Sequence, residues 1–327
     1  MGSCPDYDNL PIININGKLK RCAWGIFDKD GQKDVYGCLN KVTPEIVARA
    51  ATEVTHGVTI SLNWPLRVAP KPGFGRKGLV HKVISFVNSP LQIHGYDDEV
   101  EFNTQCSSQW DALCHFYDQD LQRGYNGSNP SIHDLVQDYG EEDHAAKIPT
   151  LNHWHARGGL ATRGVLIDYK AYAERKGIRY SPFSAHKITI SEIEEIASDH
   201  GIEFRPGDVF LLRTGFTEAV ESTVNEAEKI RLASSPDSAG VEDAIMAVPA
   251  DNPGFEVMRP TKGGVDGSGI LHPNFLSLLG LHIGELWDLK RLSAYCHSTG
   301  RFTFMLTSVP LNYAGSCGSP PNAMALF

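Results

Sequence analysis

Gly164-Val-Leu-Ile-Asp168 is a short, uninterrupted run of apolar residues that ends at a carboxylate. Runs of this kind are typical of strands that are buried on both faces of a sheet. A second run, Val209-Phe-Leu-Leu-Arg213, follows the turn-forming Pro206-Gly-Asp208 and predicts another buried strand. Between them, Ser191-Glu-Ile-Glu194 has the spacing of a capping box and predicts a helix that ends near Gly201. Strands that alternate with helices favour a mixed α/β fold.

Other segments extend this alternation in both directions. Thr43-Pro44 predicts a helix start, because Thr is a good N-cap and Pro suits the first helical position. Further strands are predicted at 58–62, 80–87 and 302–309, and further helices at 217–233 and 286–298. Residues 66–78 are rich in Pro, Gly and basic residues and predict a long loop of the kind that often borders a site. Residues 1–40 are irregular and predict an arm laid over a single domain, 41–327.

Composition excludes several classes of protein. The 327 residues are 41% hydrophobic, enough for a sizeable core, and the net charge of −9 argues against a nucleic-acid binder, which needs a basic face. No run approaches about 20 apolar residues, so no membrane helix is expected. The N-terminus lacks the pattern of a secretory signal, and the seven cysteines include no C-x-x-C pair. We therefore expect reduced cysteines and a cytoplasmic location.

The segment Thr104-Gln-Cys-Ser-Ser-Gln-Trp-Asp-Ala-Leu-Cys-His-Phe116 concentrates polar side chains among aromatic ones. Asp111 and His115 are four residues apart, so they would share a face on a helix and could also converge in a turn. A carboxylate can bind a metal or orient an imidazole, and a His can move protons near neutral pH. The alternative is a hydrogen-bonded pair that caps a loop. The residues by themselves leave both interpretations open.

Three common catalytic motifs are missing: the G-x-G-x-x-G and P-loop phosphate sites and the G-x-S-x-G nucleophile elbow. His153 and His155 would point to one face of a strand and could be ligands, or they could lie in a polar loop. Trp64, Trp110 and Trp154 could wall an aromatic pocket, or they could simply pack in the core. Arg157 and Arg163 could bind a substrate carboxylate, or they could form surface ion pairs.

Residues 105–115 resemble the signature H-x-G-T-H-x-D-x-P-x-H of the cyclase family, which holds bacterial kynurenine formamidase and isatin hydrolase. Asp111 and His115 match the Asp and the last His, whereas Gln105 and Gln109 stand where the two early His belong. The version Gln-Trp-Asp-x-Leu-x-His resembles a longer subgroup found in fungi and bacteria. The resemblance runs from about residue 45 to the end, through 125–127, 156–158, 163–168, 206–208, 213–215, 280–285 and 318–321.

The resemblance implies a swivelling β/β/α single domain, a site at one end of the sheets, and commonly a homodimer. It also implies that Asp111, His272 and Glu285 bind one divalent metal, Zn²⁺ or Mn²⁺, and that His115 is the catalytic acid or base. A Gln carbonyl oxygen is a weaker zinc ligand than an imidazole, so the site could instead be metal-free. Gln105 and Gln109 would then donate hydrogen bonds to an oxyanion.

The first functional hypothesis is hydrolysis of a C–N bond in a small amide or lactam. A cyclase, dehydratase or isomerase of a small metabolite is an alternative, because a weakened Lewis acid is less suited to activating water. An inactive relative that binds a small molecule is a third, although retention of Asp111 and His115 favours an enzyme. The side chains expected to contact the substrate are Gln105, Gln109, Trp110, Trp64 and Arg157.

Overall fold

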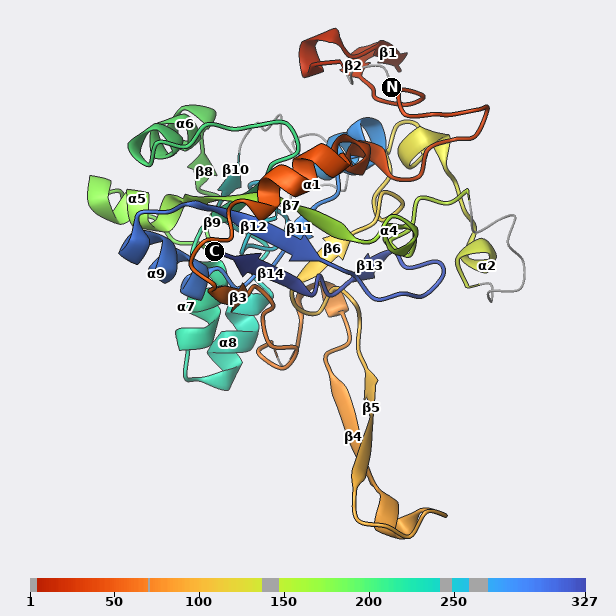
Figure 1. Cartoon of the computed structure of the whole chain (residues 1–327), viewed down its shortest axis with the longest axis vertical. Helices are drawn as coiled ribbons and strands as arrows, with labels where there is room; N and C mark the ends of the chain where they lie inside the picture. The colour runs from red at the N-terminus through yellow and green to blue at the C-terminus, as the bar shows by residue number, and fades with distance from the viewer. Residues whose placement is uncertain (1–4, 70, 137–146, 242–248, 259–269) are drawn as a thin grey trace.

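The computed structural model describes residues 5–69, 71–136, 147–241, 249–258 and 270–327. Its largest sheet has five strands in the order β3-β14-β12-β7-β9 (Figure 1). The strands are β3 (Thr59–Ser61), β14 (Ala323–Leu326), β12 (Thr303–Ser308), β7 (Leu160–Asp168) and β9 (Val209–Arg213). β7 and β9 are parallel, and the other neighbours are antiparallel. The chain therefore has a mixed α/β fold.

The two runs of apolar residues lie at the heart of this sheet. Val165 and Ile167 of β7 pack into one hydrophobic cluster, while Leu166 between them packs into the other. Each face of β7 is thus covered, which confirms the prediction of doubly buried strands. Gly164 is required by close packing, because a Cβ there would lie 2.3 Å from a ring carbon of Phe304.

Helices surround the sheet. α1 (Pro44–Ala51) packs against β7 and β12, and its N-cap is Thr43, as the sequence predicts. α5 packs on β9, and α6 packs on β7 (Figure 1). The remaining bounds are α2 (Ile132–Leu135), α4 (His153–Ala156), α5 (Tyr169–Lys176), α6 (Ile190–Asp199), α7 (Phe216–Ser222), α8 (Glu226–Ala233), α9 (Lys290–Thr299) and the π-helix η6 (Pro273–Leu279). The 3-10 turns are η1 (Tyr7–Asn9), η2 (Gly37–Lys41), η3 (Gly73–Gly75), η4 (Phe86–Asn88) and η5 (Tyr125–Gly127).

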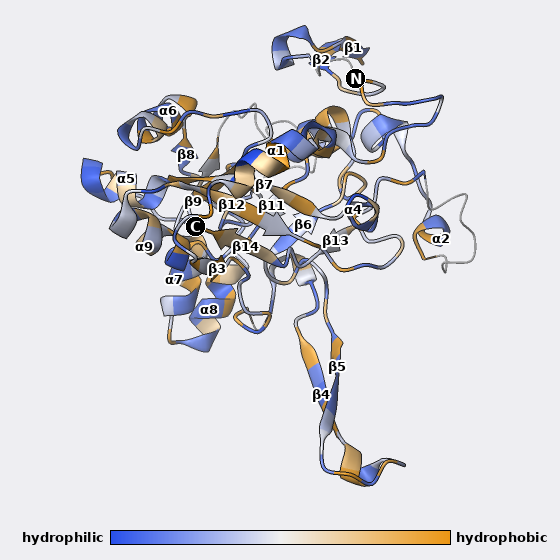
Figure 2. Cartoon of the chain, in the orientation of Figure 1, coloured by the Kyte–Doolittle hydropathy of each residue, from blue (hydrophilic) through white to orange (hydrophobic). Residues whose placement is uncertain are grey.

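Smaller sheets flank the main one. The antiparallel sheet β11-β6-β13 has β6 (Gln109–Asp111) at its centre, between β11 (Gly284–Glu285) and β13 (Gly318–Ser319). The other pairs are β1 (Ile12–Ile15) with β2 (Lys18–Arg21), β8 (Lys187–Ile188) with β10 (Gly240–Val241), and β4 (Val80–Ser85) with β5 (Tyr96–Glu101). The β4–β5 hairpin projects far from the body (Figure 1), and hydrophobic positions recur along it in Figure 2.

Several predicted boundaries are wrong for local reasons. The helix predicted at 217–233 is two helices, because Asn225 starts a new one by accepting a hydrogen bond from the Glu228 amide. The capping box is formed by Thr189 and Glu192, two residues earlier than predicted. The helix predicted from 286 begins at Lys290, after β11 and a short connection.

The N-terminal segment is anchored on η6. The Ala23 amide donates to the Leu278 carbonyl at 2.8 Å, and the Cys38 amide donates to the Gly280 carbonyl at 2.7 Å. Gly37 has a φ of +57°, and a Cβ there would lie 2.1 Å from the Gly280 oxygen, so only glycine fits. None of the described helices is long and apolar enough to cross a membrane.

Candidate metal and catalytic site

Strand β6 separates two environments, because successive side chains of a strand point to opposite faces. Gln109 and Asp111 point to one face and Trp110 to the other, and all three are buried. The Trp110 ring packs against Trp154 and Trp287, with ring centroids 5.4 and 5.1 Å away. The polar site is therefore built on one face of β6 and an aromatic cluster on the other.

A cluster of two carboxylates and one imidazole lies on the polar face. Glu285 of β11 pairs in register with Gln109, and His272 immediately precedes η6. His272 Nε2 lies 3.1 Å from Glu285 Oε1 and 3.7 Å from Asp111 Oδ2. One ligand atom from each of the three residues lies within 4.8 Å of the others. The structure thus brings together the three residues that the resemblance implies as metal ligands, from three distant segments.

Glu256 completes this cluster and was missed in the sequence. Its Oε1 lies 2.7 Å from His272 Nδ1, and both side chains are buried. Burial alone would lower the pKa of His272, but the carboxylates of Glu256, Asp111 and Glu285 raise it well above its usual value. A carboxylate on one ring nitrogen fixes the tautomer and directs the other nitrogen toward the ligand position. Glu256 belongs to no motif, so no sequence signal identifies it.

The two glutamines lie against the carboxylates. Gln105 Nε2 donates to Asp111 Oδ1 at 2.5 Å, and Gln109 Nε2 donates to Gln105 Oε1 at 2.6 Å and also to Glu285 Oε2. Burial alone would raise the pKa of Asp111, but His115, His272 and the Gln105 amide lower it. Because these amide N–H groups already bond to protein acceptors, the glutamines act here as partners of the acids.

The donor set fits a divalent cation. Asp111 Oδ2 and Gln109 Oε1 are buried and have no hydrogen-bond partner among the described residues. Leaving such acceptors unsatisfied is costly, and a cation held by Asp111 would satisfy its Oδ2. Two carboxylates and an imidazole, with amide oxygens beside them, suit Zn²⁺ or Mn²⁺. Asp111, His272 and Glu285 could therefore hold a metal.

His115 lies at the edge of this cluster and faces a cavity. Its Nε2 is 3.9 Å from Asp111 Oδ1, and its side chain is 24% exposed, unlike those of the buried acids. The cavity has a volume of about 320 Å³, and its walls include Phe74, Arg76, His115, Phe116, His272 and Glu285. An exposed imidazole beside a buried carboxylate can exchange protons with a bound molecule.

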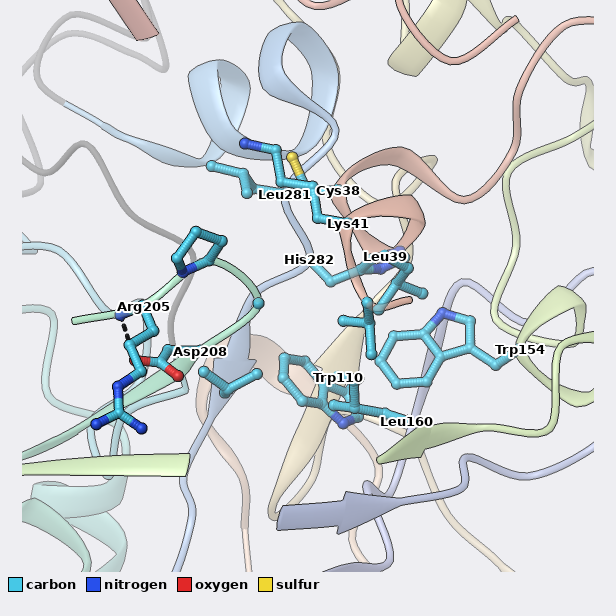
Figure 3. A pocket seen from close by; sticks show the side chains of 14 residues that line it. Cys38, Leu39, Lys41, Trp110, Trp154, Leu160, Arg205, Asp208, Leu281 and His282 are labelled. Carbon is cyan, nitrogen blue, oxygen red and sulfur yellow. Dashed lines mark hydrogen bonds between the residues drawn. The ribbon is translucent and has the colours of Figure 1, made fainter. Parts of the chain in front are cut away.

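A second cavity of about 280 Å³ lies on the aromatic face of β6 (Figure 3). The Trp110 and Trp154 rings gather on one side of it, and Arg205 and Asp208 lie on another. His282 also lines it and connects it to the site, because its Nδ1 lies 2.9 Å from the Asp111 carbonyl. Burial lowers the pKa of His282 to about 4.

Three residues expected to contact the substrate are not brought together with His115. Trp64 packs with Phe216 and donates its Nε1 hydrogen to Glu221 at 3.0 Å. Trp110 faces the second cavity, and Arg157 donates to the Val42 carbonyl at 3.0 Å. Among the described residues, none of these three lines the cavity at His115.

Other candidates have structural partners. His153 and His155 lie on helix α4 rather than a strand, and their Nε2 atoms contact backbone carbonyls at 2.8 Å. The strand-based hypothesis of a ligand pair there is therefore wrong. Arg163 forms a buried ion pair with Asp208 at 2.5 Å, so its charge is already compensated.

The comparisons with known proteins agree with this architecture. A family model described as "Cyclase: Putative cyclase" matches residues 43–257. The chain belongs to the cyclase family. A crystal structure described as a novel cyclase is 26% identical to this family member, with a TM-score of 0.74, over 94% of this chain and 99% of that one. No curated protein sequence matches the chain.

Isatin hydrolases share the fold of this cyclase-family chain. Isatin hydrolase A from Ralstonia solanacearum is 13% identical with a TM-score of 0.54, over 86% of this chain and 95% of that one. An isatin hydrolase bound to the product analogue thioisatinate is 15% identical with a TM-score of 0.55, over 85% and 94% of the two chains. At such identities the likeness concerns the fold alone, which confirms the predicted fold class.

Proposed function

We propose that this cyclase-family protein hydrolyses a C–N bond of a small amide or lactam. The observation that carries the proposal is the position of His115, whose imidazole faces a cavity beside the Asp111, His272 and Glu285 donor set. A proton-transfer group next to a cation site is an arrangement that suits hydrolysis of an amide carbonyl, because the ion can polarise the carbonyl while the imidazole moves the proton. The fold shared with isatin hydrolases supports this reaction class, because isatin is a lactam.

In this proposal Asp111, His272 and Glu285 hold one divalent ion. When bound, it would supply Lewis acidity for the substrate carbonyl and lower the pKa of water. Glu256 keeps the His272 ring fixed through Nδ1, and Gln105 and Gln109 hold the two acids in place. The resulting site is rigid, because each of these side chains is buried.

His115 is the proton carrier in this scheme. It takes a proton from the attacking water at Nε2 and delivers a proton to the leaving nitrogen. Asp111, 3.9 Å from Nε2, stabilises the protonated ring. The neighbouring Phe116 ring packs against His272 with centroids 5.6 Å apart and closes one side of the cavity. A polar residue there would admit more water.

The test combines metal analysis with a substrate panel. Protein purified without chelator is expected to carry near-stoichiometric divalent metal and to hydrolyse an aryl formamide or a lactam. His115→Ala should lower kcat by about 100-fold to 10,000-fold, the usual contribution of a positioned acid–base group. His56→Ala is the matched control, because the exposed His56 contacts Tyr295 and does not line the cavity. Activity that is insensitive to chelator would overturn the role of the metal.

A second candidate is a cyclase, dehydratase or isomerase reaction. It is favoured by the two glutamines, because they replace better ligands and their N–H groups approach the acids. Product mass separates the candidates, since hydrolysis adds one water, dehydration removes one, and isomerisation leaves the mass unchanged. Ligand binding without turnover, in both the natural protein and His115→Ala, would instead support an inactive binding protein.

We also propose a homodimer in the cytoplasm. The β4–β5 hairpin supports association, because it exposes apolar side chains away from the body, among them Val83, Tyr96 and Val100. Free thiols among the described cysteines are consistent with a reducing compartment. Light scattering should give the mass of two chains, and Val83→Asp should shift it toward one. A monomeric natural protein would contradict the dimer.

A further inference from the structure

The loop that was predicted to border a site places two side chains at the mouth of the His115 cavity. Phe74 and Arg76 both line this cavity. The Arg76 guanidinium carbon lies 5.0 Å from the centre of the Phe74 ring, so the cation is stacked on the aromatic face. The pair forms one surface, which we call the Phe74–Arg76 rim.

The backbone holds this rim in a costly conformation. Phe74 has a φ of +59°, in the left-handed region that aromatic residues avoid, and it is followed by Gly75 at +69°. Phe74 is 69% exposed. Left-handed conformations of non-glycine residues persist only where the surroundings impose them, and such positions are concentrated at ligand-binding sites. Neither core packing nor turn chemistry accounts for an exposed phenyl ring held in this way.

The charge of Arg76 lacks an acidic partner. Within the described ranges, no carboxylate oxygen lies within 4.0 Å of its guanidinium, which donates a hydrogen bond to the Gln105 carbonyl at 3.4 Å. By contrast, the buried Arg163 and Arg213 each bind an aspartate. The three acids of the site are already engaged with His272 and the glutamine amides. A half-buried cation at a cavity mouth is therefore available to an anion from solution.

We propose that the Phe74–Arg76 rim binds the carboxylate and the ring of an aromatic anionic substrate. Arg76 would bind the carboxylate through two parallel hydrogen bonds, and Phe74 and Phe116, which both line the cavity, would contact the ring. A cavity of about 320 Å³ has the size of a small single-ligand site. This inference deepens the proposed function by naming the substrate class: an aryl amide or lactam that carries a carboxylate group.

Binding can be tested without turnover. Calorimetric titration of the metal-loaded protein with benzoate, benzamide, phenylphosphonate and acetate compares a carboxylate, a neutral isostere, a second anion and a ringless carboxylate. Benzoate should bind at least about tenfold more tightly than benzamide, because only benzoate offers a charged acceptor to Arg76, and more tightly than acetate, because acetate has no ring to contact Phe74. Tighter binding of phenylphosphonate than of benzoate would overturn the assignment to a carboxylate.

The variants assign the effect to single residues. Arg76→Gln should weaken benzoate about tenfold to a hundredfold and leave benzamide unchanged, and Phe74→Ala should weaken both. Lys77→Gln is the matched control, because Lys77 is the neighbouring cation and is paired with Glu101. Benzoate affinity that is lost on chelation but unaffected by Arg76→Gln would overturn the proposal, because the carboxylate would then bind the metal alone.

Kinetic measurements distinguish a failure of the proposed carboxylate site from a failure of the proposed hydrolysis. With aryl formamides that differ only in a ring carboxylate, Arg76→Gln should raise KM for the carboxylated compound and leave kcat within about twofold. Equal KM changes for both compounds would refute the rim as a carboxylate site while hydrolysis stands. Benzoate binding that depends on Arg76, without hydrolysis of any amide, would support the rim and refute the proposed reaction.

Discussion

Replacing Glu256 with Gln tests whether a residue outside the ligand set controls the affinity for a metal. Glu256 Oε1 lies 2.7 Å from His272 Nδ1, and both groups are buried, so the contact is a charge-assisted hydrogen bond. Gln keeps the size and an acceptor oxygen but removes the negative charge. Loss of such a partner typically weakens metal binding by about 10-fold to 100-fold. That range corresponds to about 1.4–2.7 kcal/mol.

The assay is competition of Zn²⁺ or Mn²⁺ between the protein and a chromophoric chelator at pH 7. Glu221→Gln is the control, because Glu221 accepts a hydrogen bond from Trp64 and does not line the cavity. Its affinity should match that of the natural protein. An affinity of Glu256→Gln within twofold of the natural value would refute the role of Glu256 in holding His272. A loss far beyond 100-fold would indicate that Glu256 is itself a ligand.

Three further changes test the fold. The pKa of buried His282 is about 4 in the folded protein, against 6.5 for an exposed histidine. As the pH falls, this residue is therefore protonated in the unfolded chain before it is protonated in the folded protein. Stability is therefore full above pH 6.5 and falls by about 3 kcal/mol toward pH 4, and His282→Asn should remove this part of the slope in urea titrations. Arg213→Met, which leaves Asp168 buried without its cation at 2.8 Å, should cost about 3–5 kcal/mol in denaturant unfolding. Gly37→Ala should destabilise the protein by at least about 1 kcal/mol more than Gly31→Ala in thermal unfolding. Both glycines have a positive φ, but only a Cβ at position 37 would collide with the backbone of Gly280.

Each of these has a result that would contradict it. Arg231→Met breaks an exposed pair with Glu228 and should leave stability almost unchanged, so an equally small loss in Arg213→Met would contradict the role of burial. An unchanged pH slope in His282→Asn would mean that folding does not lower the pKa of His282. Equal losses in the two glycine variants would mean that the N-terminal segment moves away from Gly280 at little cost.

The strands that could be predicted are those whose signal is local. The apolar run of β9 has the predicted ends, Val209 and Arg213, and the run predicted at 164–168 forms the second half of β7, which begins at Leu160. The sheet that carries the site could not be predicted in this way. β6 has three residues, and its neighbours have two each and come from about residues 284 and 318. Pairs this short leave no periodic pattern, and their partners are set by tertiary packing.

Grouping residues by their closeness in the sequence misplaced Trp110. Trp110 was expected to contact the substrate together with Gln109, but the two residues are neighbours in a strand, and alternation sends Trp110 to the opposite face from Gln109 and Asp111. For the opposite reason, Glu256 and Arg76 were not predicted as site residues, because they lie far from the motif in the sequence. These two residues belong to no motif, and they reach the site because separate loops converge on His272 and Gln105.

The change from His to Gln at positions 105 and 109 alters which interactions hold the acids together. An imidazole nitrogen directed at a cation offers a lone pair, whereas a glutamine can turn either an oxygen to a cation or an N–H to a carboxylate. In the present arrangement the N–H groups reach Asp111 and Glu285, which gives each acid a neutral donor independent of any ion. Two acids this close still repel each other when both are charged, and His272, held by Glu256, is the only basic side chain within 4.0 Å of both among the described residues. The affinity for a metal should therefore depend chiefly on His272 and its partner, and less on the glutamines that replaced the ligands.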